Sequence, residues 1–186
     1  MKKYSYTVML ILIGITMASS QRLLPKQKGI EILTGILSDE NPKSSYYLSV
    51  GMTTNGKSGH YKLWALEYAH QYSIYKNLHI PQETYTAEAG YSFFLLGDAR
   101  RNITLNAGLT AVAGYESINR GENLLQDGAI IVPHDSFIYG AGERLSLETY
   151  LSDHFVLLVQ GRIKVLWGTD LEQLRPSAGV GLRFNF

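Results

Sequence analysis

From residue 28 to its C-terminus, the chain alternates apolar and polar residues with a period of two, in eight runs divided by turn-forming residues. This pattern predicts β-strands, because successive side chains of a strand point to opposite faces of the sheet. In the clearest run, Leu105, Ala107 and Leu109 share one face, whereas Thr104 and Asn106 share the other. We predict strands at 28–37, 45–54, 60–70, 82–95, 102–116, 136–150, 154–167 and 176–186.

The lengths of the predicted connections alternate as well. Those after the second, fourth and sixth strands have about four to six residues, whereas the others are longer and the one near 117–135 approaches twenty. Outer-membrane barrels combine short periplasmic turns with long outer loops, and hydrocarbon tolerates strands only in a closed sheet. The apolar faces carry aromatic residues near the strand ends, as two interfacial girdles would require: Tyr46, Tyr85, Phe93, Tyr115, Phe137, Phe155, Trp167, Phe184 and Phe186. The pattern therefore predicts an all-β fold, a transmembrane antiparallel up-and-down β-barrel of about eight strands.

A soluble, lipocalin-like barrel has the same period but turns its apolar faces inward. Here the polar faces are rich in Glu, Arg, Gly and Ser and the apolar faces are rich in aromatic residues, which favours the membrane barrel. Glu143 disturbs the pattern, because it falls in the apolar row of its strand. We expect a bulge at Gly140 and Gly142, or an interfacial position, to keep its carboxylate out of lipid. Contact with a partner subunit is the other explanation.

The first twenty residues have the features of a signal peptide. Lys2 and Lys3 are followed by the apolar run 8–16, which has about half the length that a membrane-spanning helix needs. Ala18 and Ser20 are small residues at the −3 and −1 positions before Gln21, where we expect cleavage. We therefore assign 1–20 to a signal peptide and 21–186 to an outer-membrane β-barrel domain, in the outer membrane of a Gram-negative bacterium. The sequence contains no Cys, which excludes a lipid-anchored lipoprotein, a disulfide scaffold and a zinc site built on Cys.

Charge argues against binding to nucleic acid. The whole chain has a formal charge of +1, and cleavage would remove Lys2 and Lys3 and leave +1 − 2 = −1. A nearly neutral chain lacks the basic surface that attracts phosphates. Thirteen Tyr and eighteen Gly agree with a membrane barrel, which uses interfacial aromatic residues and close backbone contacts.

The polar faces carry charged residues that would lie inside the barrel: Glu31, Glu67, Glu88, Glu116, Arg144, Glu148, Arg162, Lys164 and Arg183. Acids dominate the first five strands and bases the last three. An eight-stranded barrel is narrow enough for side chains to fill it. We therefore expect a lumen packed with salt bridges, since an unpaired buried charge is unfavourable. A proton or ion path is the alternative.

The chain ends with Leu182, Phe184 and Phe186 at alternate positions, which resembles the signal that the barrel-assembly machinery reads. An ordinary amphipathic last strand would also give this pattern. We predict no catalytic residue, cofactor or metal site, because the sequence lacks HExxH, GxSxG and paired-His motifs. We place the five histidines, His60, His70, His79, His134 and His154, in turns and loops. A membrane-embedded lipid or peptide hydrolase could use His70 or His79 with a nearby Ser such as Ser73.

Three stretches carry a resemblance to a known family: LPKQKGIEI (24–32), IPQETYTAEAGYSFFLLGDARRNITLNAGLTAVAGYESINRG (80–121) and RPSAGVGLRFNF (175–186). They resemble the conjugative transposon protein TraO family over nearly the whole mature chain. The resemblance implies a role in conjugative DNA transfer by a mobile element, within the mating apparatus at the envelope of a Gram-negative host. It implies no catalytic residue.

Together these observations predict a non-enzymatic barrel that anchors or completes the mating apparatus. Outer-membrane lipid, the barrel-assembly machinery and other conjugative transfer proteins are its expected partners, with no direct binding to nucleic acid. One barrel of this size is too narrow to pass DNA, so any conduit would lie in an oligomer or a partner. The predicted outer loops at 75–81 and 114–135 could display binding groups or simply cap the barrel. An adhesin or a narrow porin is the alternative function.

Overall fold

The structure is a computed structural model, and it describes residues 24–38, 45–75, 78–99, 101–119, 136–169 and 171–186. The predicted signal peptide, with its cleavage site at Ala18, Ser20 and Gln21, lies outside the described residues. The described residues form eight strands: β1 (Lys28–Leu37), β2 (Tyr46–Asn55), β3 (Tyr61–Tyr75), β4 (Leu78–Gly97), β5 (Ile103–Ile118), β6 (Ser136–Tyr150), β7 (Phe155–Trp167) and β8 (Leu174–Asn185). All of the predicted strands are therefore present.

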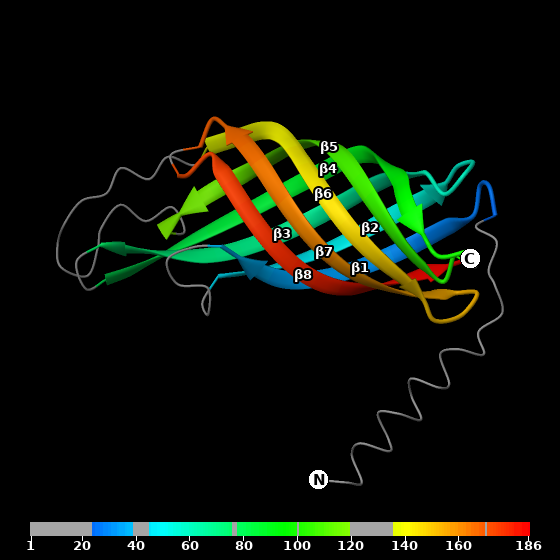
Figure 1. The fold of residues 1–186 in the computed structure, drawn as a ribbon. Helices are drawn as coiled ribbons and strands as arrows, with labels where there is room; N and C mark the ends of the chain where they lie inside the picture. The colour runs from blue at the N-terminus through cyan, green and yellow to red at the C-terminus, as the bar shows by residue number, and fades with distance from the viewer. Residues whose placement is uncertain (1–23, 39–44, 76–77, 100, 120–135, 170) are drawn as a thin grey trace, which may run out of the picture.

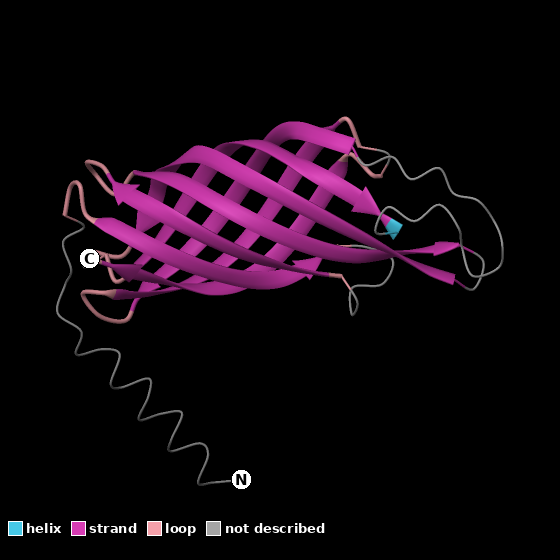
Figure 2. Ribbon diagram, turned by 180° about the vertical axis from the view of Figure 1, so that it is seen from behind, coloured by secondary structure: helices cyan, strands magenta, loops and turns pink. Residues whose placement is uncertain are grey.

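The strands close into an antiparallel barrel in which each is paired with its neighbours along the chain, and β1 is paired with β8. Strands of the near and far walls cross in Figure 2, as the tilted strands of a closed barrel must. At the seam, Lys28 and Phe186 exchange backbone hydrogen bonds of 3.2 and 2.8 Å. Closure of this kind leaves the barrel wall without a free edge, so backbone donors and acceptors are paired within the sheet.

Both ends of the barrel domain lie at one end of the barrel, which we call the terminal end; the opposite end is the loop end (Figure 1). The connections at the terminal end, 56–60, 98–102 and 151–154, have five, five and four residues. Their lengths confirm the prediction of short turns after the second, fourth and sixth strands. At the loop end, the connection between β5 and β6 spans 119–135.

The prediction of a long loop after the third strand is wrong. β3 and β4 continue as a paired hairpin as far as Tyr75 and Leu78, with only residues 76–77 between them. The predicted outer loop at 75–81 therefore belongs mostly to β4, and Figure 1 shows this hairpin projecting beyond the barrel body. The alternation of apolar and polar residues is weak in this part of the sequence, because both faces of a hairpin beyond the barrel body have similar surroundings. Pro81 is tolerated because β4 pairs with β5 only from Gln82 onward, so it lies on an edge.

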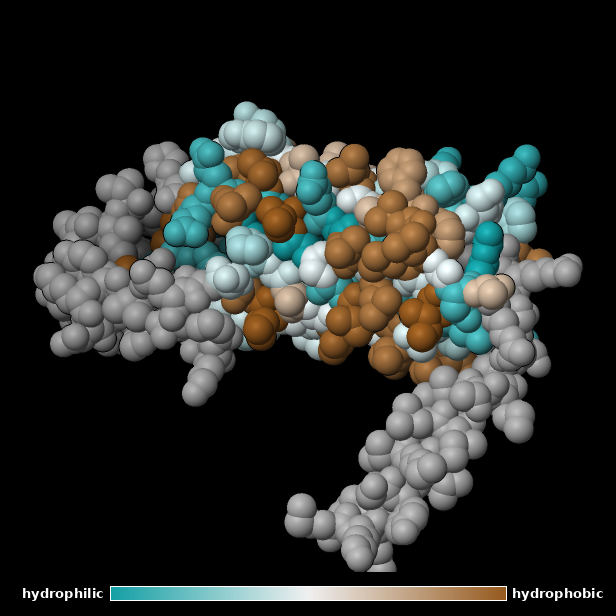
Figure 3. Space-filling model, in the orientation of Figure 1, coloured by the Kyte–Doolittle hydropathy of each residue, from teal (hydrophilic) through white to brown (hydrophobic). Residues whose placement is uncertain are grey.

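The apolar faces of the strands point outward and the polar faces point inward. Ile32, Leu66 and Phe137 on the outer wall are 55, 68 and 66 % exposed, whereas inward residues such as Glu31 are fully buried. Figure 3 shows hydrophobic side chains on the wall formed by β6, β7 and β8, which faces the viewer. This is the reverse of a lipocalin-like barrel, and an apolar wall of this extent requires a hydrocarbon environment. Among the described residues, no helix is long and apolar enough to span a membrane.

The inside of the barrel is not wholly polar. One apolar cluster consists of Leu33, Leu37, Tyr47, Tyr150, Val156 and Leu158, and a second consists of Val112, Ile138 and Leu166. These side chains close the space beside the charged groups, so the lumen is filled by packing as well as by ion pairs.

Two glycines at the seam make room for a buried ring. Gly35 of β1 is paired with Gly179 of β8, and the fully buried ring of Tyr47 lies against both. A Cβ atom at Gly179 would overlap the Tyr47 hydroxyl and the Thr34 carbonyl. Small residues at this pair are therefore a packing requirement of the seam.

We expect the substitution Gly179→Ala to lower the free energy of unfolding by about 1–3 kcal/mol, the usual penalty of overpacking. Gly161→Ala is the matched control, because a Cβ atom there would meet no atom within 4 Å. Urea titrations of the folded barrel in lipid vesicles, followed by tryptophan fluorescence, measure both variants. Equal unfolding midpoints for the two variants would contradict the packing argument.

Candidate functional site in the barrel lumen

Alternation brings charged side chains from seven strands into the lumen, where they form ion pairs in three layers. The structure places all nine sequence-predicted lumen residues there, each buried: Glu31, Glu67, Glu88, Glu116, Arg144, Glu148, Arg162, Lys164 and Arg183. Arg175 of β8 joins them. The ion-paired groups described in the lumen are thus five carboxylates and five cations, so their formal charges cancel.

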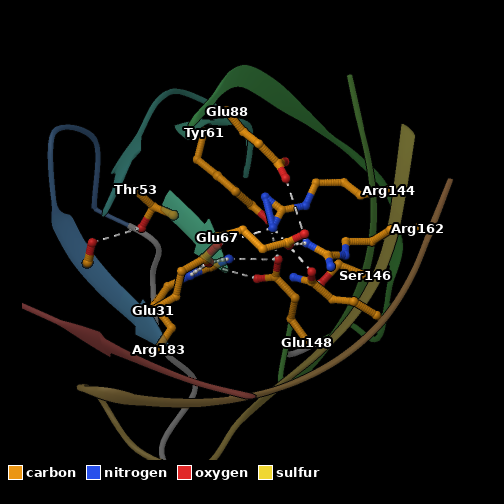
Figure 4. Close-up of polar contacts among 12 residues, drawn as sticks. Glu31, Thr53, Tyr61, Glu67, Glu88, Arg144, Ser146, Glu148, Arg162 and Arg183 are labelled. Atoms are coloured by element: carbon orange, nitrogen blue, oxygen red, sulfur yellow. Dashed lines mark hydrogen bonds and ion pairs between the residues drawn. The ribbon is translucent and has the colours of Figure 1, made fainter. Parts of the chain in front are cut away.

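The terminal layer, nearest the terminal end, is built around Arg183. Its guanidinium lies 3.0 Å from Glu31 and 2.9 Å from Glu148, measured between Nη2 and Oε2 and between Nη1 and Oε2. Tyr61 and Tyr150 donate hydroxyl hydrogen bonds of 2.7 and 3.2 Å to Glu148. The guanidinium also lies over the Tyr61 ring, 4.4 Å from its centroid. Arg183 therefore has partners on β1, β3 and β6, on several sides of the lumen (Figure 4).

The middle layer joins opposite walls of the barrel. Glu67 on β3 accepts hydrogen bonds of 2.6 Å from Arg162 and 2.7 Å from Lys164, both on β7. Glu88 on β4 forms an ion pair with Lys164 as well. The Arg162 guanidinium lies 3.9 Å from the centroid of the Tyr47 ring, the ring seated on the glycine pair of the seam. Since β3 and β7 are four strands apart around the barrel, these contacts hold its two sides at a set distance.

Arg144 links the terminal and middle layers, and a third layer lies at the loop end. Arg144 Nη2 is 3.1 Å from Glu31 Oε1 and 3.2 Å from Gln160 Oε1. At the loop end, Arg175 Nη2 lies 2.6 Å from Glu116 Oε2, and the Thr169 hydroxyl donates to Glu116 over 2.8 Å.

Sequence reasoning missed Arg175 because the last strand was predicted to begin at residue 176, whereas β8 begins at Leu174. Extending the alternation by two residues from Ser177 would have found it. It also missed the lumen roles of Tyr47, Tyr61 and Tyr150, because tyrosine in a membrane barrel suggested the girdles. Their positions in the strands already assigned all three to the inward face.

The described part of the lumen contains an internal cavity of about 20 Å³ at the loop end, lined by side chains that include Leu37, Gln71, Thr84, Lys164 and Arg175. A volume of this size holds about one water molecule. With both charge signs paired across the barrel, the arrangement is suited to bracing the wall.

The histidines considered for catalysis do not lie together. His70 and His79 belong to β3 and β4, so their predicted position in turns or loops is wrong. His70 is on the outer wall, covered by the rings of Tyr46 and Tyr72 at 5.5 and 4.7 Å between centroids. The side chains of Ser73 and His79, and all of His134, lie outside the described residues. In the part of the chain that is described, no three His, Cys, Asp or Glu side chains gather to hold a metal ion.

The other two histidines contact the backbone in the short turns of the terminal end. His60 Nδ1 accepts a hydrogen bond of 3.1 Å from the Phe94 amide. His154 Nδ1 lies 2.8 Å from the Asn185 carbonyl oxygen, and its ring stacks on Phe184. Both residues tie a turn to the neighbouring strand.

The remaining predicted features lie on the outer wall. Leu182, Phe184 and Phe186 point outward and are 50, 43 and 56 % exposed. The bulge expected near Glu143 is absent, because the pairing of β6 with β5 and β7 runs without a shift from Gly140 to Arg144. Glu143 therefore stays on the outward face. A shift in register occurs instead in β4, between Phe94 and Leu96.

The sequence model of one family, described as conjugative transposon protein TraO, matches residues 24–186. The chain belongs to the TraO family. This match covers all eight strands, and it confirms the resemblance carried by 24–32, 80–121 and 175–186. No curated protein is similar enough in sequence to count as a relative of this TraO-family chain.

Solved structures of other proteins share the fold of this TraO-family chain. Neisserial surface protein A is 12 % identical, with a TM-score of 0.59 over 86 % of this chain and 96 % of that one. Ail of Yersinia pestis, solved with the heparin analogue sucrose octasulfate, is also 12 % identical, with a TM-score of 0.57 over 88 and 100 %. The N-terminal barrel domain of Pseudomonas aeruginosa OprF is 15 % identical, with a TM-score of 0.52 over 87 and 98 %. At these identities the likeness concerns the fold, which is that of small outer-membrane barrels.

We expect Arg183→Met to lower the free energy of unfolding by about 3–5 kcal/mol, because it leaves the carboxylates of Glu31 and Glu148 buried without their main cation. Adding Glu148→Gln to the same chain should restore most of the loss, since Glu31 keeps Arg144 as its cation and the lumen charges balance again. Unfolding in urea measures both chains, with the exposed turn variant Lys57→Met as the control. A stable Arg183→Met single variant would contradict the proposed ion pairing.

We also expect the purified monomer to give no resolved unitary current in a planar lipid bilayer, because paired side chains fill the lumen. A 16-stranded porin in the same bilayer is the positive control. Steady unitary currents of porin size from the monomer would refute a closed lumen.

Proposed function

We propose that this TraO-family barrel is a non-enzymatic anchor and assembly partner of the conjugative transfer apparatus, in the outer membrane of a Gram-negative host. The observation that carries the proposal is an apolar outer wall around a lumen sealed by ion pairs. Such a body is built to stay in a bilayer and hold its shape, and family membership supplies the process in which it acts.

The outer-membrane location is supported by the apolar outer wall and by the outward side chains in and after β8. The outward aliphatic and aromatic side chains match what acyl chains and their interfaces accept. The last strand presents Leu182, Phe184 and Phe186 outward, as an assembly signal would. Because outer-membrane barrels have their short turns on the periplasmic side, the terminal end would face the periplasm and the loop end would face the outside of the cell.

The sealed lumen argues that the barrel acts through its surfaces. The described cavity at the loop end holds about one water, so neither DNA nor a protein could pass through a single barrel. Any conduit would then belong to a partner or to an assembly of several chains. Contacts with other transfer proteins are the remaining way for this barrel to contribute.

The alternative functions have less support. Ail was solved with a heparin analogue, but its likeness to this chain lies in the fold, so it does not argue for adhesion here. Hydrolysis would need a histidine beside a nucleophile, and His70 is instead enclosed by tyrosine rings on the outer wall.

Deletion of the coding region in donor cells tests the proposal. We expect transfer of the mobile element to fall to background while adhesion to surfaces and recipient cells stays unchanged, because the barrel is needed for the apparatus. A plasmid copy of the intact chain should restore transfer. A copy with Phe186→Ser should not, because its assembly signal is damaged and less folded barrel reaches the membrane. Normal transfer without the chain, or a loss of adhesion alone, would contradict the proposed role.

A further inference from the structure

Glu143 is an outward carboxylate in the middle of the barrel wall. It is the eighth of the fifteen residues of β6, seven residues from either end of the strand. The register places it between Leu109 of β5 and Ile163 of β7, which point outward like itself. The Glu143 carboxylate forms no ion pair or hydrogen bond with any described residue.

This position is unfavourable in an isolated barrel. A carboxylate at the level of the acyl chains loses its water and gains no partner in return. The outward lysines of the described strands do not help, because Lys28 and Lys62 are the first and second residues of β1 and β3, at the terminal end. The fold therefore carries a charge that it does not satisfy by itself.

A hollow in the outer wall lies beside this carboxylate. It has a volume of about 660 Å³, and its lining includes Phe93, Leu109, Glu143, Leu145, Gly161 and Ile163. Gly161 in this lining has no side chain, and a Cβ atom there would meet nothing within 4 Å. Larger side chains stand around it, so the hollow can receive a side chain from a neighbouring body.

We infer that this hollow docks a membrane-embedded segment of another transfer protein, which places a Lys or Arg against Glu143. The inference rests on the proposed function, since it names a contact through which the barrel would join the apparatus. Charge complementarity selects the occupant: the carboxylate needs a cation, and burial of the pair between two apolar surfaces strengthens their attraction.

A second copy of this chain fits the hollow less well. Two barrels in one membrane share the same orientation, so symmetric docking of this wall would bring Glu143 against Glu143. The described outward residues of the neighbouring copy offer no cation at that level, because Lys28 and Lys62 lie at the terminal end. A partner with its own basic residue satisfies the carboxylate directly.

The first test uses the purified barrel in lipid vesicles. We expect Glu143→Leu to raise the urea midpoint of unfolding, because it removes an unsatisfied charge from the acyl region. Val50 is the matched control, since it lies mid-strand on β2, on the opposite wall, and is 48 % exposed. Val50→Glu should lower the midpoint, and Val50→Leu should leave it unchanged. A lower midpoint for Glu143→Leu would overturn the premise that the carboxylate is unsatisfied.

The second test uses a photo-crosslinking amino acid at position 145 in donor cells that carry the whole element, with the same amino acid at position 50 as control. We expect a crosslink from position 145 alone, to a membrane-embedded peptide of another transfer protein that contains Lys or Arg. Glu143→Leu should abolish it and lower transfer, although the isolated barrel is more stable. Glu143→Lys should do the same, and reversal of the partner's basic residue to Glu should restore both crosslink and transfer.

Filling the hollow gives a variant that keeps the charge. Gly161→Leu should remove the crosslink from position 145 without lowering the urea midpoint, because its side chain extends into open space. The control is Ala87→Leu, in a second outer hollow of about 650 Å³ centred away from Glu143, and it should leave the crosslink in place.

Three outcomes would overturn the inference. One is a crosslink between two copies of this chain, and another is a crosslink that persists in Glu143→Leu. The third is the absence of any crosslink from position 145 in cells whose transfer requires the chain, which would leave the proposed function intact. Transfer that does not require the chain at all would refute the proposed function instead.

Discussion

The pairing of every backbone donor and acceptor within one closed sheet is the constraint on which the rest of this structure depends. Hydrocarbon offers no hydrogen bonds, so a wall of strands can lie in it only when no edge is free. Closure between β1 and β8 meets that demand, and it divides the side chains of each strand between two unlike environments. The apolar exterior and the charged interior are two consequences of the same closure.

The interior solves a second problem, which closure creates. Alternate residues must point into a narrow space where few water molecules fit, so their charges need partners within the barrel. Cations on β6, β7 and β8 meet carboxylates that come mostly from β1, β3, β4 and β5. Because the pairs of Glu67 with Arg162 and Lys164 cross the lumen, they also join walls that lie four strands apart around the sheet. The same ion pairs therefore satisfy the buried charges and brace the wall.

Among the described residues of the outer wall, Glu143 is a mid-strand charge for which the fold provides no partner. The lumen charges are paired, but this carboxylate points outward beside a hollow made by Gly161. A protein that only had to remain in a membrane would be more stable with an apolar residue there. A component of a larger assembly has a use for such a group, because an unsatisfied charge within an apolar surface discriminates strongly among partners.

The sequence by itself determined the strands, their inward and outward faces and the set of charged lumen residues, because a period of two converts position directly into direction. It also indicated the TraO family, through three stretches of residues that resemble that family. It did not determine how far β3 and β4 extend, because beyond the barrel mouth both faces of a hairpin have similar surroundings and alternation is no longer required. Only the tertiary structure decided which acid meets which base, how Tyr47 packs on Gly35 and Gly179, and that no bulge turns Glu143 away from the outer wall. These depend on the register and closure of eight strands, through which residues distant in the chain become neighbours.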